Sequence, residues 1–362
     1  MANQEEPLHT AEQLNNDAIK KILMRVPATS LLRYQLVCKN WWAMIQEPQF
    51  KKDHFKLNNM TNGPLRLLVV KGRVRTGVFC EKSMPVDVES QQRKIWMPRV
   101  LGNDGHFAGS CNGLLCTEVK GEITVFNPIT REVVYLPKPT YITGYGSNEN
   151  EKMYTDFFFH SATDEYKVLL FHRKHPTMLW SVNMYTLGAN SSWRQVDEIS
   201  DMPSNSGVNV EDTIYWPYFS EDYSRAIISF NLSEEKINLV YPPIEDAKLV
   251  GVTKWHGELC GVSFQREHGI QYGRIKIWIL DAGGLWTMRY EVHLQANGIV
   301  RLLAPFSIIM NRVFFVISKS TLICHDMSGN GGDIGVQYGY LDSTCQIKNC
   351  FAYVESLLPV PK

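Results

Sequence analysis

The stretch from residue 14 to residue 54 reads LNNDAIKKILMRVPATSLLRYQLVCKNWWAMIQEPQFKKDH, and two prolines divide it. Apolar residues recur three and four positions apart in its first part, which predicts one apolar stripe on a helix: Ile19, Ile22, Leu23 and Val26. Pro27 ends this helix, because proline lacks an amide donor and clashes with the preceding turn. A second helical stretch, capped by Thr29 or Ser30, follows and ends at Pro48.

The limits and charge of this module can also be read from the sequence. Asp17 and the asparagines before it are good helix caps, and the polar, acidic residues 1–13 are expected to be a loose N-terminus. The alternative is an earlier start of the first helix, because Asn15 lacks the stop that a proline would impose. Residues 14–54 hold seven basic and three acidic groups, a net charge of +4 that favours an acidic partner. A piece of about 40 residues rarely supports its own core, so we expect it to pack on a neighbour or a partner.

The order of the residues in this stretch resembles the F-box, the module that docks on the SKP adaptor of cullin-based ubiquitin ligases. The matching residues are Leu14, Asp17, Ile22, Leu23, Arg25, Pro27, Ser30, Leu31, Arg33, Val37, Cys38, Lys39, Trp41, Pro48, Phe50 and His54. The chain departs from the family pattern at Val26, where leucine is usual, and at Asn15, where proline is usual.

This resemblance implies a set of adaptor-binding residues, with the apolar ones expected to dominate the binding energy. The set is Leu14, Asn15, Ile22, Leu23, Pro27, Leu31, Arg33, Val37, Cys38 and Trp41. The sequence does not separate residues that face a partner from those that pack inside the module. The alternative is an amphipathic helical hairpin that only caps the larger domain.

From Leu65 onward the sequence has the pattern of a β-protein, with short apolar runs between turn residues. One run recurs as ITVFNP at 123, VNMYTL at 182, IISFNL at 227, IKIWIL at 275 and LICHDM at 322, at intervals of 59, 45, 48 and 47 residues. Other strand-like runs precede and follow it. Three or four short strands per ~45–50 residues is the period of propeller blades.

The sequence therefore predicts a mainly β chain with a small α N-terminal module, in which a helical F-box precedes a β-propeller. Five repeats are visible, and the runs 65–70 and 350–353 can pair to complete a sixth blade. Several aromatic residues are expected to pack between blades: Phe126, Tyr215, Trp216, Phe230, Trp278 and Trp286. A β-sandwich with accidental spacing is the alternative.

The second half also resembles the F-box-associated domain of plant F-box proteins, which is related to kelch-type propellers, over about residues 65–357. The phrases that carry the resemblance are Gly109–Cys116, Phe126–Arg131, Leu136–Pro137, Asp164–Val168, Ser192–Arg194, Ile214–Trp216 and Ile228–Leu232. Asp212 departs from the family, which usually has a turn glycine there. Aspartate tolerates a left-handed turn, so no change of fold is expected. The polar residues 55–64 are interpreted as a turn-rich joint, which divides the chain into 14–57 and 58–362.

The composition excludes several classes of protein. Lys plus Arg equals Asp plus Glu at 37 each, so no net field attracts nucleic acid or acidic lipid. No apolar run approaches the ~20 residues of a membrane span. The first ten residues lack the pattern of a signal peptide, and the eight cysteines show no zinc spacing, so we expect reduced thiols in the cytoplasm or nucleus. No motif for a cofactor or metal is present.

These observations lead to a functional expectation. The resemblance implies a non-catalytic substrate-recognition subunit of a SKP–cullin–F-box (SCF) ubiquitin ligase. Its partners would be the SKP-type adaptor, through it a cullin, and a protein substrate. Two alternatives stay open: a propeller enzyme or sugar-binding protein with a helical cap, which needs convergent carboxylates or a metal set, and a scaffold outside any ligase.

Overall fold

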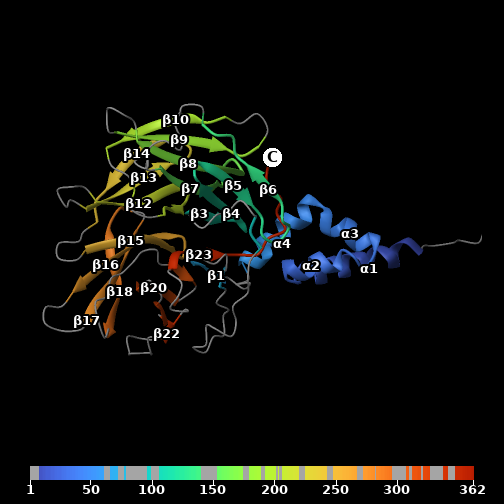
Figure 1. The fold of residues 1–362 in the computed structure, drawn as a ribbon. Coiled ribbons are helices and arrows are strands. Elements are labelled where there is room, and N and C mark those ends of the chain that lie inside the picture. Colours follow the sequence, from blue (N-terminus) through green and yellow to red (C-terminus); the bar gives the residue numbers. More distant parts are fainter. Residues whose placement is uncertain are drawn as a thin grey trace, which may run out of the picture.

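The computed structural model places a helical module beside a larger body of β-sheets (Figure 1). The structure describes residues 8–60, 66–71, 77–78, 96–98, 106–139, 153–173, 179–188, 192–200, 203, 206–219, 225–242, 248–266, 272–281, 283–295, 307–309, 312–318, 321–326, 337–340 and 347–362. None of the helices in these ranges is long and apolar enough to cross a membrane.

Four helices form the N-terminal module: α1 (Leu8–Leu23), α2 (Ala28–Tyr34), α3 (Lys39–Gln46) and α4 (Pro48–Met60). Pro27 lies between α1 and α2, and Pro48 begins a new helix after α3, as the breaks at both prolines predicted. The second stretch is interrupted, however, between α2 and α3. There Leu36 N donates to Arg33 O and Val37 N donates to Tyr34 O, each at 3.0 Å, so a tight turn replaces the helix.

Three boundaries in the module differ from the sequence prediction. The helix α1 starts at Leu8, so residues 8–13 are helical and Asp17 lies within the helix instead of capping it. Without a proline at position 15, nothing stops the helix from extending toward the N-terminus. The N-cap of α2 is Pro27, with no side-chain cap, so neither Thr29 nor Ser30 has that role. The fixed φ of proline already suits a helix start.

The third difference concerns the expected joint. Residues 55–60 lie in α4 and do not form turns, whereas residues 61–65 lie outside the described residues. The helix is anchored by His54, which is buried and has Nε2 2.7 Å from Val26 O. Asn58 then donates from its side chain to His54 O at 2.7 Å. The polar side chains that predicted turns are therefore used to hold the last turns of a helix.

The strands form six antiparallel sheets in the described part of the chain, one with three strands and five with four. The first two four-stranded sheets contain β3 (His106–Cys111), β4 (Leu114–Val119), β5 (Glu122–Phe126) and β6 (Val133–Tyr135), and then β7 (Met153–His160), β8 (Glu165–Arg173), β9 (Trp180–Thr186) and β10 (Arg194–Ile199). The next three contain β11 (Val208–Val210), β12 (Thr213–Phe219), β13 (Arg225–Asn231) and β14 (Lys236–Val240); β15 (Lys248–Trp255), β16 (Glu258–Arg266), β17 (Tyr272–Leu280) and β18 (Trp286–Gln295); and β19 (Ser307–Ile309), β20 (Arg312–Ser318), β21 (Thr321–Asp326) and β22 (Gln337–Tyr340). The three-stranded sheet contains β1 (Arg66–Lys71), β2 (Gly77–Val78) and β23 (Ile347–Tyr353).

The repeated run found in the sequence is the third strand of each four-stranded sheet, namely β5, β9, β13, β17 and β21. The first strands were not predicted. Gly109 lies inside β3, and the turn that follows is Asn112–Gly113. A Cβ atom at Gly109 would lie 3.0 Å from Phe157 O, so the residue allows two neighbouring first strands to approach closely.

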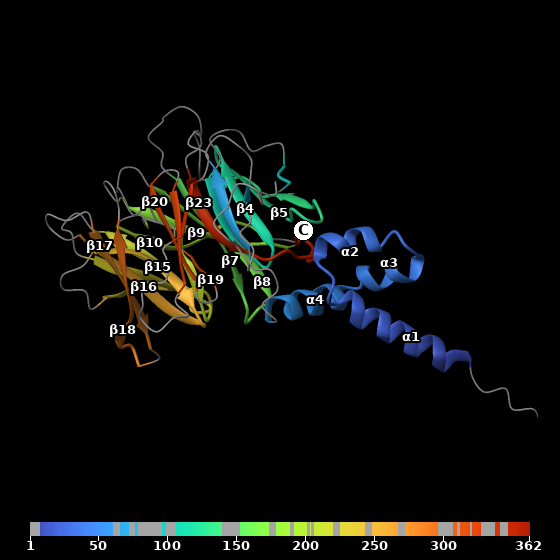
Figure 2. The same ribbon diagram turned by 90° about the horizontal axis from the view of Figure 1, so that it is seen from below.

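Both ends of the β-rich region meet in one sheet. The strand β1 pairs antiparallel with β23, with Val69 opposite Cys350, which confirms the predicted pairing of runs 65–70 and 350–353. In turn, β23 lies against the first strands β3 and β19. The sheets therefore follow one another around a closed ring whose innermost strands face its centre, which is the architecture of a β-propeller (Figures 1 and 2).

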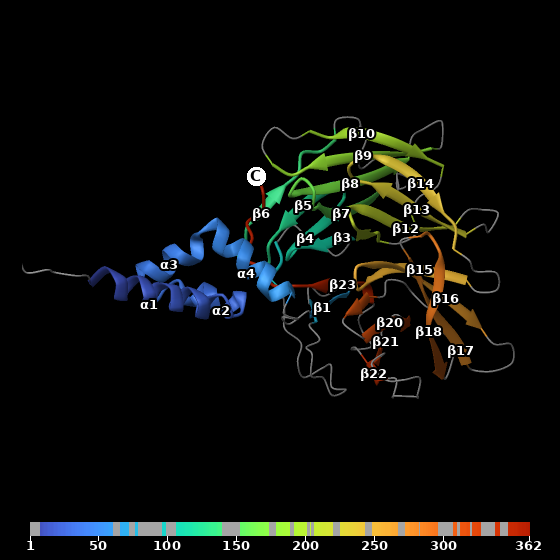
Figure 3. The same ribbon diagram turned by 180° about the vertical axis from the view of Figure 1, so that it is seen from behind.

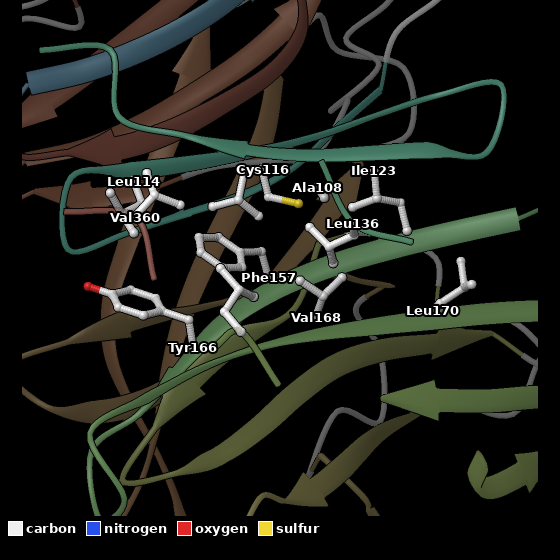
Figure 4. Packing of buried hydrophobic residues seen from close by; sticks show 12 residues of the cluster. Ala108, Leu114, Cys116, Ile123, Leu136, Phe157, Tyr166, Val168, Leu170 and Val360 are labelled. Atoms are coloured by element: carbon white, nitrogen blue, oxygen red, sulfur yellow. The ribbon is translucent and has the colours of Figure 1, made fainter. Parts of the chain in front are cut away.

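Apolar clusters fill the spaces between successive sheets. Figure 4 shows one of them, in which Ala108, Cys116 and Ile123 face Phe157, Val168 and Leu170 of the next sheet. Five of the six predicted aromatic residues pack in such clusters: Phe126, Tyr215, Trp216, Phe230 and Trp286. Trp278 is the exception, because it is half-buried and donates to Ser263 Oγ within its own sheet at 3.1 Å.

Candidate adaptor-binding surface and central cavity

The helical module has a buried core of its own and a second set of apolar residues that face solvent. The helices contribute Leu23, Ala28, Leu31, Met44, Ile45 and Phe50 to this core, and Leu357 from near the C-terminal end belongs to the same cluster. The exposed set is Ile22 at 64%, Tyr34 at 39%, Leu36 at 82%, Val37 at 62% and Trp42 at 54% exposure. We refer to the exposed set as the apolar surface. Figures 1 and 2 show α1 and α3 extending away from the propeller, so the far part of the module is open to a partner.

The structure divides the predicted adaptor-binding residues into two groups. Leu23 and Leu31 are 1% and 0% exposed and belong to the core, so they cannot touch a partner directly. The exposed members are Ile22, Pro27, Arg33, Val37 and Cys38, and Trp41 is half-buried. Leu14 and Asn15 lie in α1, where only their backbone is described.

Sequence reasoning missed Tyr34, Leu36 and Trp42. A usable signal was present, because Ile22–Leu23, Leu36–Val37 and Trp41–Trp42 are adjacent apolar pairs. Neighbouring residues on a helix point about 100° apart, so a single buried stripe seldom accounts for both members of such a pair. In Ile22–Leu23 and Trp41–Trp42 the structure buries one member more deeply than the other, whereas Leu36 and Val37 are both exposed in the turn.

The turn between α2 and α3, which carries exposed Leu36 and Val37, is held by contacts on both sides. Cys38 caps α3, and its Sγ accepts from Trp41 N at 3.5 Å. The rings of Tyr34 and Trp41 lie 5.8 Å apart across this turn. A preformed apolar turn binds at a lower entropic cost than a flexible one.

A cavity of about 590 Å³ opens at the centre of the propeller. Its wall includes parts of the first strands of five sheets and of β23, with apolar residues such as Phe158, Val252 and Ile308. Three carboxylates, Asp156, Glu211 and Asp212, also line it. The convergent carboxylates that the enzyme alternative requires are therefore present, and their hydrogen bonds decide what they can do.

Asp156 is buried, and its carboxylate is surrounded by donors from two sheets. It accepts from Gly207 N at 2.6 Å, Trp216 Nε1 at 2.8 Å, Tyr154 Oη at 3.1 Å and Phe157 N at 3.2 Å. Burial raises the pKa of Asp156 to about 7, against the opposing effect of these hydrogen bonds. The group therefore joins the sheet of β7 to the sheet of β12, which is a structural role.

Asp212 has a similar role at the edge of the cavity. Its carboxylate accepts from Ser161 N and Ser161 Oγ at 2.8 Å each and from Ala162 N at 3.2 Å. Burial alone raises the pKa of Asp212, but these hydrogen bonds outweigh it and hold the pKa below its usual value. Two of the three cavity carboxylates thus connect neighbouring sheets. The described residues contain no group of three or more His, Cys, Asp or Glu side chains placed to hold a metal ion.

A helical module with an exposed apolar surface, attached to a propeller, defines a protein built for binding. Comparison with known proteins identifies its family. A model described as the F-box domain matches residues 12–53, and a model described as the F-box associated beta propeller domain matches residues 70–298. The chain belongs to the plant F-box proteins that carry an F-box-associated β-propeller domain.

The relatives agree with this assignment. A protein of Arabidopsis thaliana that is named as an F-box protein is 22% identical over 312 residues, which cover 80% of this chain and 81% of the relative. An F-box/kelch-repeat protein of the same plant is 23% identical over 239 residues, which cover 63% of this chain and 65% of the relative. Among solved structures, a TolB chain from Agrobacterium tumefaciens is 12% identical, with a TM-score of 0.41 over 82% of this chain and 99% of that chain.

Membership of this family implies a general role in binding other proteins. An F-box implies binding to a SKP-type adaptor and to a substrate protein, and the combination with a propeller supports the role of a substrate receptor in an SCF ligase. F-box proteins are as a rule non-catalytic subunits of such ligases.

Proposed function

We propose that this chain is the subunit that selects a protein for ubiquitination and degradation by an SCF ligase, with the helical module bound to the adaptor and the propeller bound to the substrate. The cullin is recruited through the adaptor, and the conjugating enzyme supplies the chemistry. The chain itself contributes proximity, because it raises the effective concentration of substrate lysines near the reacting thioester.

The observation that carries this proposal is the apolar surface. Leu36 and Val37 are 82% and 62% exposed although they lie in a folded module with its own core. Large apolar side chains gathered on one small module mark an interaction site. The surrounding net charge of +4 over residues 14–54 favours an acidic partner and faster association.

The location and the excluded partners belong to the same proposal. We place the protein in the cytoplasm or nucleus, where its cysteines stay reduced. Its balanced charge, 37 basic against 37 acidic groups, supports a role without nucleic acid or membrane.

The test is co-purification with a SKP-type adaptor. The double variant Leu36→Glu, Val37→Glu places two carboxylates on the apolar surface without touching the core, and it is expected to abolish adaptor binding. The control is Leu239→Glu, because Leu239 is 48% exposed on β14 and far from the module. Unchanged binding by the double variant would contradict the adaptor site, and turnover of a small molecule by the chain alone would favour the enzyme alternative.

The substrate side is tested in cells. The double variant keeps the propeller but loses the adaptor, so on overexpression it is expected to protect the substrate and lengthen its half-life. Candidate substrates are the proteins that the intact chain and the double variant both retain in mass-spectrometric pull-downs.

A further inference from the structure

The C-terminal segment from Val354 to Val360 lies between the helical module and the propeller (Figure 3). We refer to it as the C-terminal strap. It follows β23 directly and has no regular secondary structure. Even so, Ser356, Leu357 and Val360 are 0%, 2% and 3% exposed. A chain terminus buried to this degree is held by specific contacts.

On one side the strap completes the core of the helical module. Leu357 packs in the same cluster as Leu23 and Leu31. Beside it, Thr29 Oγ1 donates to Glu355 Oε2 at 3.4 Å. The small module thus obtains part of its core from the far end of the chain, as its size led us to expect.

On the other side the strap is fixed to the first four-stranded sheet of the propeller. Asn127, which is fully buried, donates from Nδ2 to Ser356 O at 3.0 Å and to Leu358 O at 2.8 Å. Val360 N donates to Glu132 Oε2 at 3.1 Å, and the Val360 side chain enters the cluster of Figure 4. Leu357 lies between the two residues that Asn127 holds, and its side chain packs into the helical module.

A glycine makes room for the strap. Gly113 has φ +80°, and a Cβ atom there would lie 2.3 Å from Ser356 Cβ and 2.7 Å from Val354 O. Any other residue would displace the strap. The phrases 109–116 and 126–131, which carry the resemblance to the F-box-associated domain, therefore include two residues that seat the C-terminus.

We infer that the C-terminal strap is a positioning element that fixes the orientation of the propeller relative to the helical module, with Leu357 and Asn127 as its positioning residues. The peptide chain joins the two parts once after α4, and the strap joins them a second time. Two smaller contacts lie beside these connections: Ile129 packs against the module core, and Lys52 Nζ in α4 lies 2.6 Å from Asp164 Oδ2 in an exposed ion pair. The functional consequence of this inference rests on the proposed function: in the ligase, a bound substrate is held at a set distance and angle from the conjugating enzyme.

The decisive variant is Asn127→Asp, which keeps the size of the side chain. One oxygen still accepts from Ile129 N and Thr130 N, as Asn127 Oδ1 does at 2.8 and 3.2 Å. The other oxygen now faces two carbonyl oxygens of the strap, which releases it by repulsion. Asn238→Asp on the exposed strand β14 is the matched control, with the same change of charge and size.

The first readout is the distance between two spin labels, introduced as non-natural amino acids at exposed Gln49 in α4 and exposed Lys236 in β14. A single narrow distance is expected in the parent chain and in Asn238→Asp, and its loss is expected in Asn127→Asp. Leu357→Ala should also lose the single narrow distance, whereas Leu357→Met, which keeps a large apolar side chain, should retain it. A narrow distance in both Asn127→Asp and Leu357→Ala would overturn the inference.

The second readout is ubiquitin transfer by the reconstituted ligase to the lysines of the propeller itself, mapped by mass spectrometry. Loss of orientation is expected to slow this transfer by about tenfold, with adaptor affinity unchanged. Misplacing a reacting group by about 1 Å can lower a rate by as much as about a hundredfold. An unchanged rate with a broadened distance would overturn the positioning role. If the parent chain fails to bind the adaptor, the proposed function fails, yet the spin-label distances still decide what the strap does.

Discussion

The Asp212 carboxylate accepts hydrogen bonds from the backbone amide and from the hydroxyl of Ser161, both at 2.8 Å, and so joins two neighbouring sheets. Asp212 lies in the turn between β11 and β12 with φ +61°, a left-handed conformation that favours glycine. The family usually has a turn glycine here. This chain accepts the strained conformation and gains a link between sheets that glycine could not provide.

Replacing Asp212 with glycine therefore has two opposing effects on stability. Asp212→Gly relieves the left-handed backbone, but it removes the acceptor for three hydrogen bonds, from Ser161 N, Ser161 Oγ and Ala162 N. We expect a net loss of about 1–2 kcal/mol in the free energy of unfolding, since three hydrogen bonds to a charged carboxylate outweigh the backbone term even though Ser161 and Ala162 are exposed. Chemical denaturation of the full chain measures it.

The control lies next to it in the sequence. Glu211 has φ +48°, is exposed, and so shares the strain without the cross-sheet hydrogen bonds. Glu211→Gly is expected to leave stability unchanged or slightly higher. An equal loss in both variants would mean that glycine entropy, and not the link to Ser161, decides the outcome.

Ile22 and Leu23 are adjacent, but replacing them with alanine is expected to have different effects on stability and on adaptor binding. Leu23→Ala empties a core position that is 1% exposed, which is expected to cost about 2–5 kcal/mol of module stability. Ile22→Ala changes a side chain that is 64% exposed, so stability should change by less than about 0.5 kcal/mol. Adaptor binding should nevertheless weaken by more than about 1 kcal/mol.

Calorimetry of adaptor binding and thermal unfolding separate the two effects. The substitution Leu23→Arg would bury a charge and unfold the module, so its loss of binding would say nothing about the interface. Loss of binding in Ile22→Ala together with loss of helical signal would contradict the assignment of Ile22 to the surface.

Asn15 gives a third prediction, because it lies inside α1 and not at its start. Asn15→Pro is expected to unwind residues 8–14, since proline in a helix interior costs about 3 kcal/mol. The helix would then begin at position 15, where proline is tolerated as a first-turn residue. Adaptor affinity is expected to stay equal or improve.

Amide hydrogen exchange of residues 8–14 is the measurement. Asn15→Ala is the control and should increase protection there, because alanine is the best helix former. Loss of adaptor binding in Asn15→Pro alone would show that the N-terminal turns of α1 belong to the interface.

Asp156 gives a prediction on pH. Its pKa rises from an ordinary value of 3.8 to about 7 in the folded chain because the group is buried. Between these values the native state holds a proton that the unfolded chain has released. The contribution of Asp156 to stability is therefore complete below pH 3.8 and is lost as the pH rises toward 7, with a slope of at most about 1.4 kcal/mol per pH unit.

Denaturation between pH 4 and pH 7 tests this slope. Asp156→Asn does not titrate, so its profile should be flatter than that of the parent chain. The variant is less stable, because its NH2 group replaces the oxygen that accepts from Phe157 N, while its amide oxygen can still accept from Trp216 and Gly207. Glu234→Gln, which alters an exposed carboxylate, should leave the profile unchanged. A parallel shift of the Asp156→Asn profile would contradict protonation at this site.

Much of the fold follows from local pattern. The third strand of each four-stranded sheet was predicted from spacing and alternation, and the helix breaks were predicted from Pro27 and Pro48, because these features depend only on neighbours along the chain. The innermost strands were missed. The strand β7 is buried along most of its length and β11 has three residues, so neither shows the alternation of a half-exposed strand.

The sequence by itself determined the order of an F-box and a propeller, since helical spacing, proline breaks and a repeated strand period are properties of short segments. The tertiary structure decided which residues of the module are available to a partner. Leu23 belongs to a buried cluster that includes Leu357, which lies 334 positions away, whereas Ile22 is 64% exposed. Burial depends on what packs together in space, and this cluster is complete only when the C-terminal strap, held by Asn127, returns to the module.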